Sequence, residues 1–162
     1  MTESDVGRSQ QSSGAKTKYR RALTSLVALR HGRPGSKLRC IVVAGDYGTG
    51  TVVRLIAELL SEAGKDVVEI TPESSDARYQ HDMRVFQREL AEAQMAKAHY
   101  VVIEVTQSFI NMMAHMTIRL DTVVALTDCP AARELIKQPL KHVVAPCGME
   151  VPGVEGHNVM TF

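Results

Sequence analysis

The segment that most constrains this chain runs from residue 40 to residue 64. It opens with a short apolar run, residues 40–44, that is rich in β-branched side chains and predicts a strand buried on both faces of a sheet. A turn with three glycines follows, and apolar residues then recur at spacings of three and four, which predicts an amphipathic helix closed by Gly64. This order directs backbone N–H groups and the positive end of a helix toward an anion.

The rest of the chain alternates short apolar runs with helical periodicity. We expect strands at residues 66–70, 100–105, 121–127 and 141–145, helices at 18–31, 80–98 and 130–138, one short helix at 109–116, and an edge strand at 158–162. This alternation predicts an α/β fold of the P-loop type: a parallel sheet of about five strands between two layers of helices. We expect one domain over residues 17–162 and a disordered tail over the polar residues 1–16.

Composition narrows the function classes. The net charge of +1 argues against nucleic acid and anionic membranes as partners, and the sequence has neither a long apolar run nor an apolar leader. Three widely spaced cysteines predict reduced thiols in a cytoplasmic protein. A metal site from Cys129, His142 and Cys147 fits no standard zinc spacing.

The carboxyl ends of the predicted strands collect the polar residues, and ligands of parallel sheets bind at that edge. The phosphate-loop pattern is G-x-x-x-x-G-K-[ST], and counting from Gly45 places Thr51 where the lysine belongs. The turn still offers backbone N–H groups to a nucleotide or small anion. The candidate phosphate-binding residues are Gly45, Asp46, Tyr47, Gly48, Thr49, Gly50 and Thr51, and further residues of this edge are Thr106, Thr127 and Asp128.

Residues 42–64 read VVAGDYGTGTVVRLIAELLSEAG and resemble the ATP-binding segment of the Mur ligase superfamily, which includes the UDP-N-acetylmuramoyl-peptide synthetases and the folylpolyglutamate synthetases. On the family loop [TA]-G-T-N-G-K-[TG]-[TS], Gly45 and Gly48 match and Thr49 replaces the phosphate-binding lysine. The run 102–108, VIEVTQS, is similar to the family's strand ending in E-V-S-S-H, with Ser108 in place of the histidine. The run 121–128, DTVVALTD, resembles the strand that leads into T-N, but the D-H pair that follows it in the family is absent.

The resemblance spans residues 38–130 and implies ATP and Mg²⁺ as ligands, with the Thr51 hydroxyl and the Glu104 carboxylate holding the metal. We also expect the chain to lack the family's N-terminal substrate domain and C-terminal domain. Because the lysine, the histidine and the D-H pair are missing, we expect no catalytic residues and a binding or regulatory pseudo-ligase. Such a protein would be linked to peptidoglycan precursor metabolism and would dimerise or dock on an active ligase. If the chain were active, the resemblance implies an ATP-dependent amide-forming ligase.

Two other classes stay open. Gly48-x-Gly50-x-x-Val53 is a dinucleotide-binding fingerprint without its last glycine, and Glu69 lies about 20 residues later, where an acid would bind the ribose. Alternatively, the methionine-rich residues 109–116 could cover a partner in a pure protein-interaction or dimerisation module.

Overall fold

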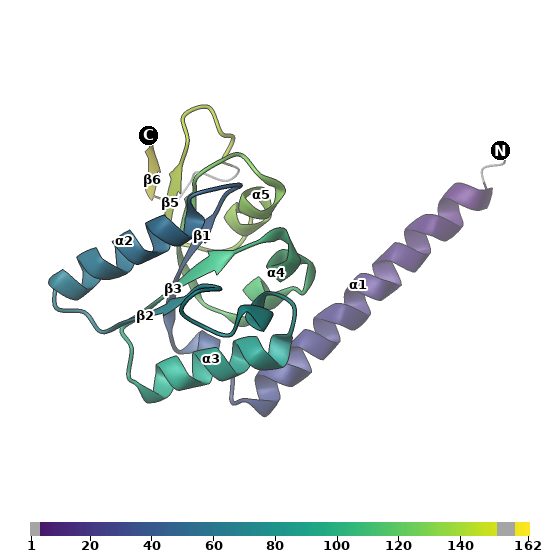
Figure 1. Cartoon of the computed structure of the whole chain (residues 1–162). Coiled ribbons are helices and arrows are strands. Elements are labelled where there is room, and N and C mark those ends of the chain that lie inside the picture. Colours follow the sequence, from purple (N-terminus) through teal and green to yellow (C-terminus); the bar gives the residue numbers. More distant parts are fainter. Residues whose placement is uncertain (1–3, 152–157) are drawn as a thin grey trace.

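The computed structural model describes residues 4–151 and 158–162. Figure 1 shows an α/β body from which the long N-terminal helix projects. In chain order the elements are α1 (Ser4–Arg30), the 3-10 turn η1 (Pro34–Ser36), β1 (Arg39–Ala44), α2 (Thr49–Glu62), β2 (Val67–Ile70), η2 (Ala77–Gln80), α3 (Met83–Met95), β3 (Tyr100–Val105), α4 (Gln107–Asn111), η3 (Ala114–Thr117), β4 (Leu120–Ala125), α5 (Pro130–Ile136), β5 (His142–Ala145) and β6 (Asn158–Thr161).

The six strands form one parallel sheet in the order β2-β3-β1-β4-β5-β6. The α/β fold class predicted from the sequence is therefore confirmed, and residues 158–161 add the sixth strand at one edge. Strand β1 lies in the centre, with Val43 in register with Glu104 of β3 on one side and with Val124 of β4 on the other. The carboxyl ends of these three strands consequently meet at the turn before α2.

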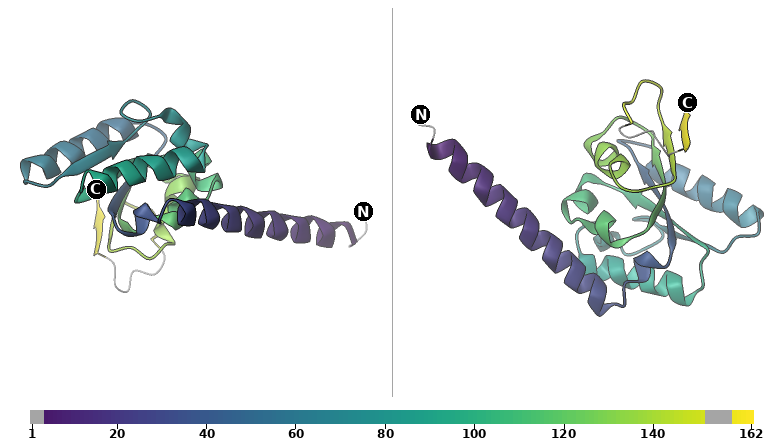
Figure 2. Two further views of the ribbon diagram at one scale, coloured as in Figure 1. Left: turned by 90° about the horizontal axis from the view of Figure 1, so that it is seen from below. Right: turned by 180° about the vertical axis from the view of Figure 1, so that it is seen from behind.

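Helices cover both faces of the sheet (Figures 1 and 2). Helix α2 packs on one face through Val53 and Ala57, which contact Ile41, Val43 and Val102. Helices α3, α4 and α5 contribute to the larger core on the other face. Its centre holds Phe86 and Phe109, whose rings meet edge to face at 4.8 Å between centroids. A parallel sheet needs apolar cover on both faces, and the continuous apolar strands of this sequence satisfy that need.

Helix α2 ends as the sequence predicts. Gly64 has φ 74°, its N–H donates to Ser61 O, and the N–H of Lys65 donates to Leu60 O. These two bonds form a Schellman motif, which favours glycine because the backbone there is left-handed. Helix α3 ends in the same pattern, but Lys97, with φ 57°, stands at the left-handed position.

Three expectations from the sequence differ from the structure. Helix α1 begins at Ser4, so the stretch predicted as a tail is helical from that residue on, since each added residue of an existing helix gains one backbone hydrogen bond. Helix α3 begins at Met83 rather than residue 80, because the Asp82 carboxylate accepts the N–H of Arg84 and caps it. The single helix expected over 109–116 is two short segments, α4 and η3, separated at Met113, whose φ is 61°.

Helix α1 packs on the body through its last turns. Thr24 and Ala28 are buried, and the Thr24 hydroxyl donates to Met112 O at 3.1 Å. The rest of α1 leads away from the sheet, as both views of Figure 2 show. None of the helices in the described residues combines the length and the apolar character that a bilayer crossing requires.

Candidate phosphate-binding site

The candidate site is the turn that joins β1 to α2. Gly48 is the N-cap of α2, with φ 74° and ψ 1°, and no side chain caps the helix there. The first N–H groups of a helix have no intrahelical partner, so those of Thr49, Gly50 and Thr51 face outward from the helix start. The left-handed backbone at Gly48 and the free N–H groups make the local geometry that binds anions.

Two of the glycines have close neighbours. A Cβ atom added to Gly45 would lie 2.9 Å from the Cβ of Leu126, which follows β4. One added to Gly50 would lie 3.2 Å from Glu104 Oε2. The turn is therefore pressed against the ends of both neighbouring strands, and only a residue without a side chain fits at Gly45.

Glu104 and Thr49 form the most specific contact at the site. The Thr49 Oγ1 donates to Glu104 Oε1 at 2.7 Å, and Thr49 is buried while Glu104 is half-buried. Because β3 is next to β1, the carboxylate lies against the start of α2. A negative charge at the positive end of a helix is favourable, so Glu104 serves as an anion of the chain's own at this position.

Asp46 is tied to the end of β4. Its N–H donates to Thr127 Oγ1 at 3.1 Å, and the Thr127 hydroxyl donates back to Asp46 Oδ2 at 2.8 Å. This reciprocal pair fixes the first half of the turn. Tyr47 next to it is 76% exposed.

The remaining candidates are more scattered. Thr51, expected to hold magnesium, is exposed on α2, and Thr49 rather than Thr51 contacts Glu104. Asp128 faces away into an ion pair with Arg133 at 2.6 Å, and this hydrogen bond lowers the pKa of the Asp128 carboxyl. Arg54, the nearest cation along α2, pairs with Glu73 at 3.0 Å.

Thr106 belongs to a hydrogen-bonded chain that the sequence did not indicate. Its hydroxyl donates to Gln80 Oε1, Gln80 Nε2 donates to the Tyr79 hydroxyl, and the Tyr79 hydroxyl donates to Glu104 O at 2.9 Å. Burial raises the pKa of Tyr79 well above its usual value, so the hydroxyl remains a donor at neutral pH. This chain holds the end of β3 and thereby positions Glu104. Its members have no common spacing in the sequence, and only the fold brings them together.

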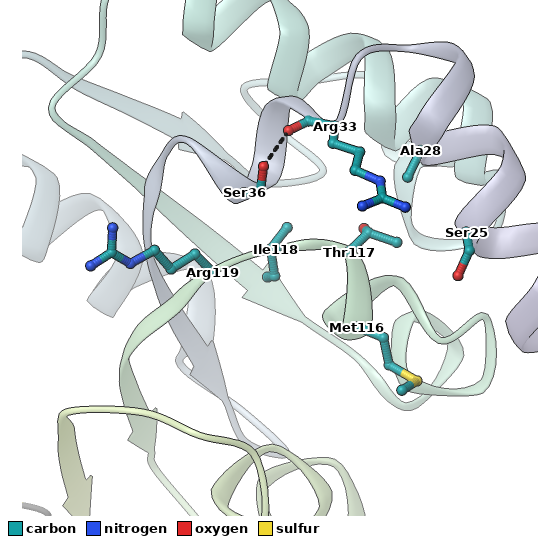
Figure 3. Close-up of a pocket in the computed structure, with 8 residues that line it drawn as sticks. All are labelled: Ser25, Ala28, Arg33, Ser36, Met116, Thr117, Ile118 and Arg119. Carbon is teal, nitrogen blue, oxygen red and sulfur yellow. Dashed lines mark hydrogen bonds between the residues drawn. The ribbon is translucent and has the colours of Figure 1, made fainter.

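Hollows lie near both ends of the sheet, and two of them bear on the argument. One, of about 430 Å³, adjoins the candidate site and is lined by Leu126, Thr127, Asp128 and residues 146–149. The other, of about 290 Å³, lies at the amino ends of β1 and β4, far along the strands from the glycine turn. In Figure 3 the Arg33 side chain points over Thr117 toward Ser25 in this second hollow, and Arg119 extends away from it.

The described residues contain no cluster of three or more His, Cys, Asp or Glu side chains that could hold a metal. A site from Cys129, His142 and Cys147 is therefore not formed. Beside the start of α2 the oxygen ligands on offer include the Glu104 carboxylate and the Thr49 hydroxyl. This set suits a Mg²⁺ ion that takes its other ligands from phosphates and water, because magnesium sites use one or two carboxylates in that way.

The strand order decides between the two nucleotide-binding patterns. In the dinucleotide-binding order 3-2-1-4-5-6, the second strand lies beside the first and brings its acidic residue to the glycine turn. In this protein β3 lies between β2 and β1, so Glu69 of β2 is one strand removed from the turn and Glu104 takes the adjacent place. The sheet thus differs from the dinucleotide-binding arrangement.

The methionine-rich residues 109–116 contribute mainly to the core. Phe109, Ile110 and Ala114 are buried, and Met112 packs against the same cluster. Met116 is 39% exposed, so this segment presents little continuous apolar surface of its own.

One comparison with known proteins supports the fold class. No family model matches the chain, and no curated protein matches it. Among solved structures, that of a UDP-N-acetylmuramoyl-L-alanyl-D-glutamate–2,6-diaminopimelate ligase is similar, with a TM-score of 0.60 and 19% sequence identity over 76% of this chain. The fold is Mur-ligase-like. The match covers 31% of the ligase chain, so this protein corresponds to less than a third of that enzyme.

Proposed function

We propose that this chain binds the phosphate groups of a nucleotide at the turn between β1 and α2 and does not catalyse ATP-driven amide formation. The observation that carries this proposal is the place of Thr49. It stands where the related loop pattern has a lysine, and its hydroxyl donates to Glu104 rather than pointing into open space. A hydroxyl supplies no positive charge to the β- and γ-phosphates, and phosphoryl transfer depends on that charge.

Phosphate binding itself is supported by the backbone. The N–H groups at the start of α2 are without intrahelical partners, and Gly48 supplies the left-handed turn that directs them outward. The Glu104 carboxylate would repel a bare phosphate at this place, and a Mg²⁺ ion held by Glu104 would supply the positive charge that offsets this repulsion. We therefore infer that magnesium and ATP, or another phosphate-bearing ligand, bind together.

The biological role that we propose is that of a binding or regulatory pseudo-ligase. Support comes from the likeness of its fold to a ligase named for a UDP-N-acetylmuramoyl peptide substrate. On this proposal the protein acts beside an active ligase of peptidoglycan precursor metabolism or as a homodimer, and its nucleotide site reports on ATP rather than consuming it.

Isothermal titration of the full chain tests the proposal, with Mg-ATP, ATP in the presence of a chelator, and NAD as ligands. We expect Mg-ATP to bind and its affinity to fall at least tenfold without Mg²⁺. Glu104→Gln should cause a similar loss, whereas Glu58→Gln, an exposed carboxylate on the outer side of α2, should cause none. Thr49→Lys should bind at least tenfold more tightly, because a hydrogen bond to a charged group contributes about 1.5–3 kcal/mol.

Three outcomes would contradict the proposal. Turnover of ATP at the ordinary enzyme rate of about 1 s⁻¹ or more would contradict the proposal that the chain is not catalytic. If neither Glu104→Gln nor Thr49→Lys changed the affinity for Mg-ATP, the nucleotide would bind at another place on the protein. Binding of NAD with no response to ATP would favour the dinucleotide-binding class instead.

A further inference from the structure

Helix α1 carries an apolar face that the body does not cover. Successive residues of an α-helix are about 100° apart, so Thr24 and Ala28, which are buried against the body, mark the inner side. The side chains on the opposite side are apolar and exposed: Tyr19 is 67% exposed, Leu23 44%, Leu26 61% and Leu29 56%. An amphipathic helix normally turns its apolar side to the core, and α1 turns these four residues, its outer stripe, toward solvent.

Cations lie along both edges of the outer stripe. On the helical wheel Lys18 flanks it on one side and Arg20 on the other, and Arg30 lies within it. All three side chains are exposed and have no ion-pair partner among the described residues. The stripe is therefore an apolar surface bordered by positive charge.

The sequence around the stripe is free of compensating acids. Between Asp5 and Asp46 there are nine lysines and arginines and no aspartate or glutamate. The net charge of the whole chain is close to zero because the positive charge of the N-terminal segment is offset by the negative charge of the body. The small net charge was the reason to expect no anionic membrane as partner, and that reasoning fails when the two parts are considered separately.

A second copy of α1 is a poor cover for this stripe. Pairing two such helices would bring Lys18, Arg20 and Arg30 of each copy together with no acidic residue to neutralise them, and like charges at a helix–helix edge are destabilising. The missing partner must instead be anionic and must accept apolar side chains along one straight ridge.

We propose that the outer stripe of α1 docks the protein on an anionic lipid surface. Leucines and a tyrosine bordered by lysine and arginine are the composition of helices that lie in the membrane interface. The shape also fits. Helix α1 projects from the body as a rod (Figure 1), and the outer stripe lies on the side opposite the buried Thr24 and Ala28, so a flat surface can meet the stripe with the body on the far side. An acidic protein would need a groove to receive the same ridge.

The hollow beside α1 extends the basic surface. Arg33, just after the helix, lies over Thr117 and near Ser25, and its guanidinium has no hydrogen-bond or ion-pair partner among the described residues (Figure 3). The exposed Met116 lines the same hollow. A lipid phosphate in this hollow would therefore meet the Arg33 guanidinium and the Ser25 hydroxyl, because the Thr117 hydroxyl already donates to Ala114 O.

Flotation with lipid vesicles tests this docking on the full chain. We expect binding to vesicles of phosphatidylglycerol and phosphatidylcholine in equal parts, and at least tenfold weaker binding to phosphatidylcholine alone. Raising the ionic strength from about 0.1 M to about 1 M shortens the screening length from about 10 Å to about 3 Å and should release the protein. Lys18→Gln with Arg20→Gln should weaken binding about thirtyfold, since each cation near an anionic surface contributes about fivefold.

Matched leucine variants distinguish a loss of docking from a loss of folding and from a general effect of replacing exposed leucines. Leu26→Gln with Leu29→Gln should weaken binding at least tenfold, whereas Leu55→Gln with Leu59→Gln, equally exposed leucines on α2, should not. Circular dichroism checks that each variant is folded. The proposal would be overturned by equal binding to neutral vesicles or by an equal loss of binding in the α2 variants. A dimer in light scattering without vesicle binding would also overturn it and would favour a second copy of the chain as the partner of the stripe. A folded wild-type protein that binds no vesicle would overturn it as well.

Discussion

The contact between Thr49 and Glu104 predicts a measurable coupling energy. Thr49→Val removes the hydroxyl at nearly constant shape, and Glu104→Gln removes the charge. The hydrogen bond is 2.7 Å long and its donor is buried, which places it among charge-assisted bonds that contribute about 1.5–3 kcal/mol. Because Glu104 is half-buried and solvent competes for its second oxygen, we expect the coupling to lie at or just below the lower end of that range, about 1–1.5 kcal/mol.

A double-mutant cycle measures this coupling. The free energy of unfolding of the wild type, the two single variants and the double variant is obtained from urea titrations, and the interaction energy is the departure from additivity. Glu58→Gln replaces Glu104→Gln in a control cycle, and we expect its coupling to Thr49→Val to stay below about 0.3 kcal/mol. The same low value for Glu104 would contradict a charge-assisted bond between the two side chains, and the account of the site would then be wrong.

Three further perturbations test other parts of the structure. Gly45→Ala should destabilise the fold by about 1–3 kcal/mol, because its Cβ would lie 2.9 Å from that of Leu126; a neutral effect in urea titrations would contradict this close approach. Lys97→Gly should stabilise by about 1 kcal/mol, because it removes a side chain from a left-handed position, and a lower melting temperature would refute the assigned helix end. Burial opposes ionisation of Asp121, but its hydrogen bond and charge interaction with Arg39 prevail and lower its pKa. Its stabilising effect is therefore full above the unfolded pKa of about 3.9 and is lost as the pH falls below it, and Asp121→Asn should flatten stability over that acidic range.

Much of the local structure could be predicted from residue spacing. The strand at 39–44, the helix that follows and its end at Gly64 are signalled by side chains within a few residues of one another. The start of helix α3 is not given by residue spacing, because it depends on the Asp82 cap and several neighbouring residues are also polar. The start of helix α1 could not be predicted from residue spacing. Its first half is polar and has no apolar periodicity, yet it continues the helix of the second half.

The candidate site could be predicted only in part. The glycine turn was evident, but Thr51 seemed the residue that would meet Glu104, and the structure places Thr49 there. Which of two neighbouring hydroxyls faces β3 depends on where the helix begins and on how it rotates over the sheet. Neither quantity is encoded within the turn. The supports of the site, Tyr79 and Gln80, gave no sequence signal at all.

The sequence by itself determined that a strand, a glycine turn and a helix follow one another, because hydrophobic spacing and backbone freedom act over a few residues. Only the tertiary structure decided that β3 lies between β2 and β1, since the strands are similar apolar runs whose patterns do not specify their neighbours. That one pairing brings Glu104 to a residue 55 positions away in the chain and gives the turn its chemistry.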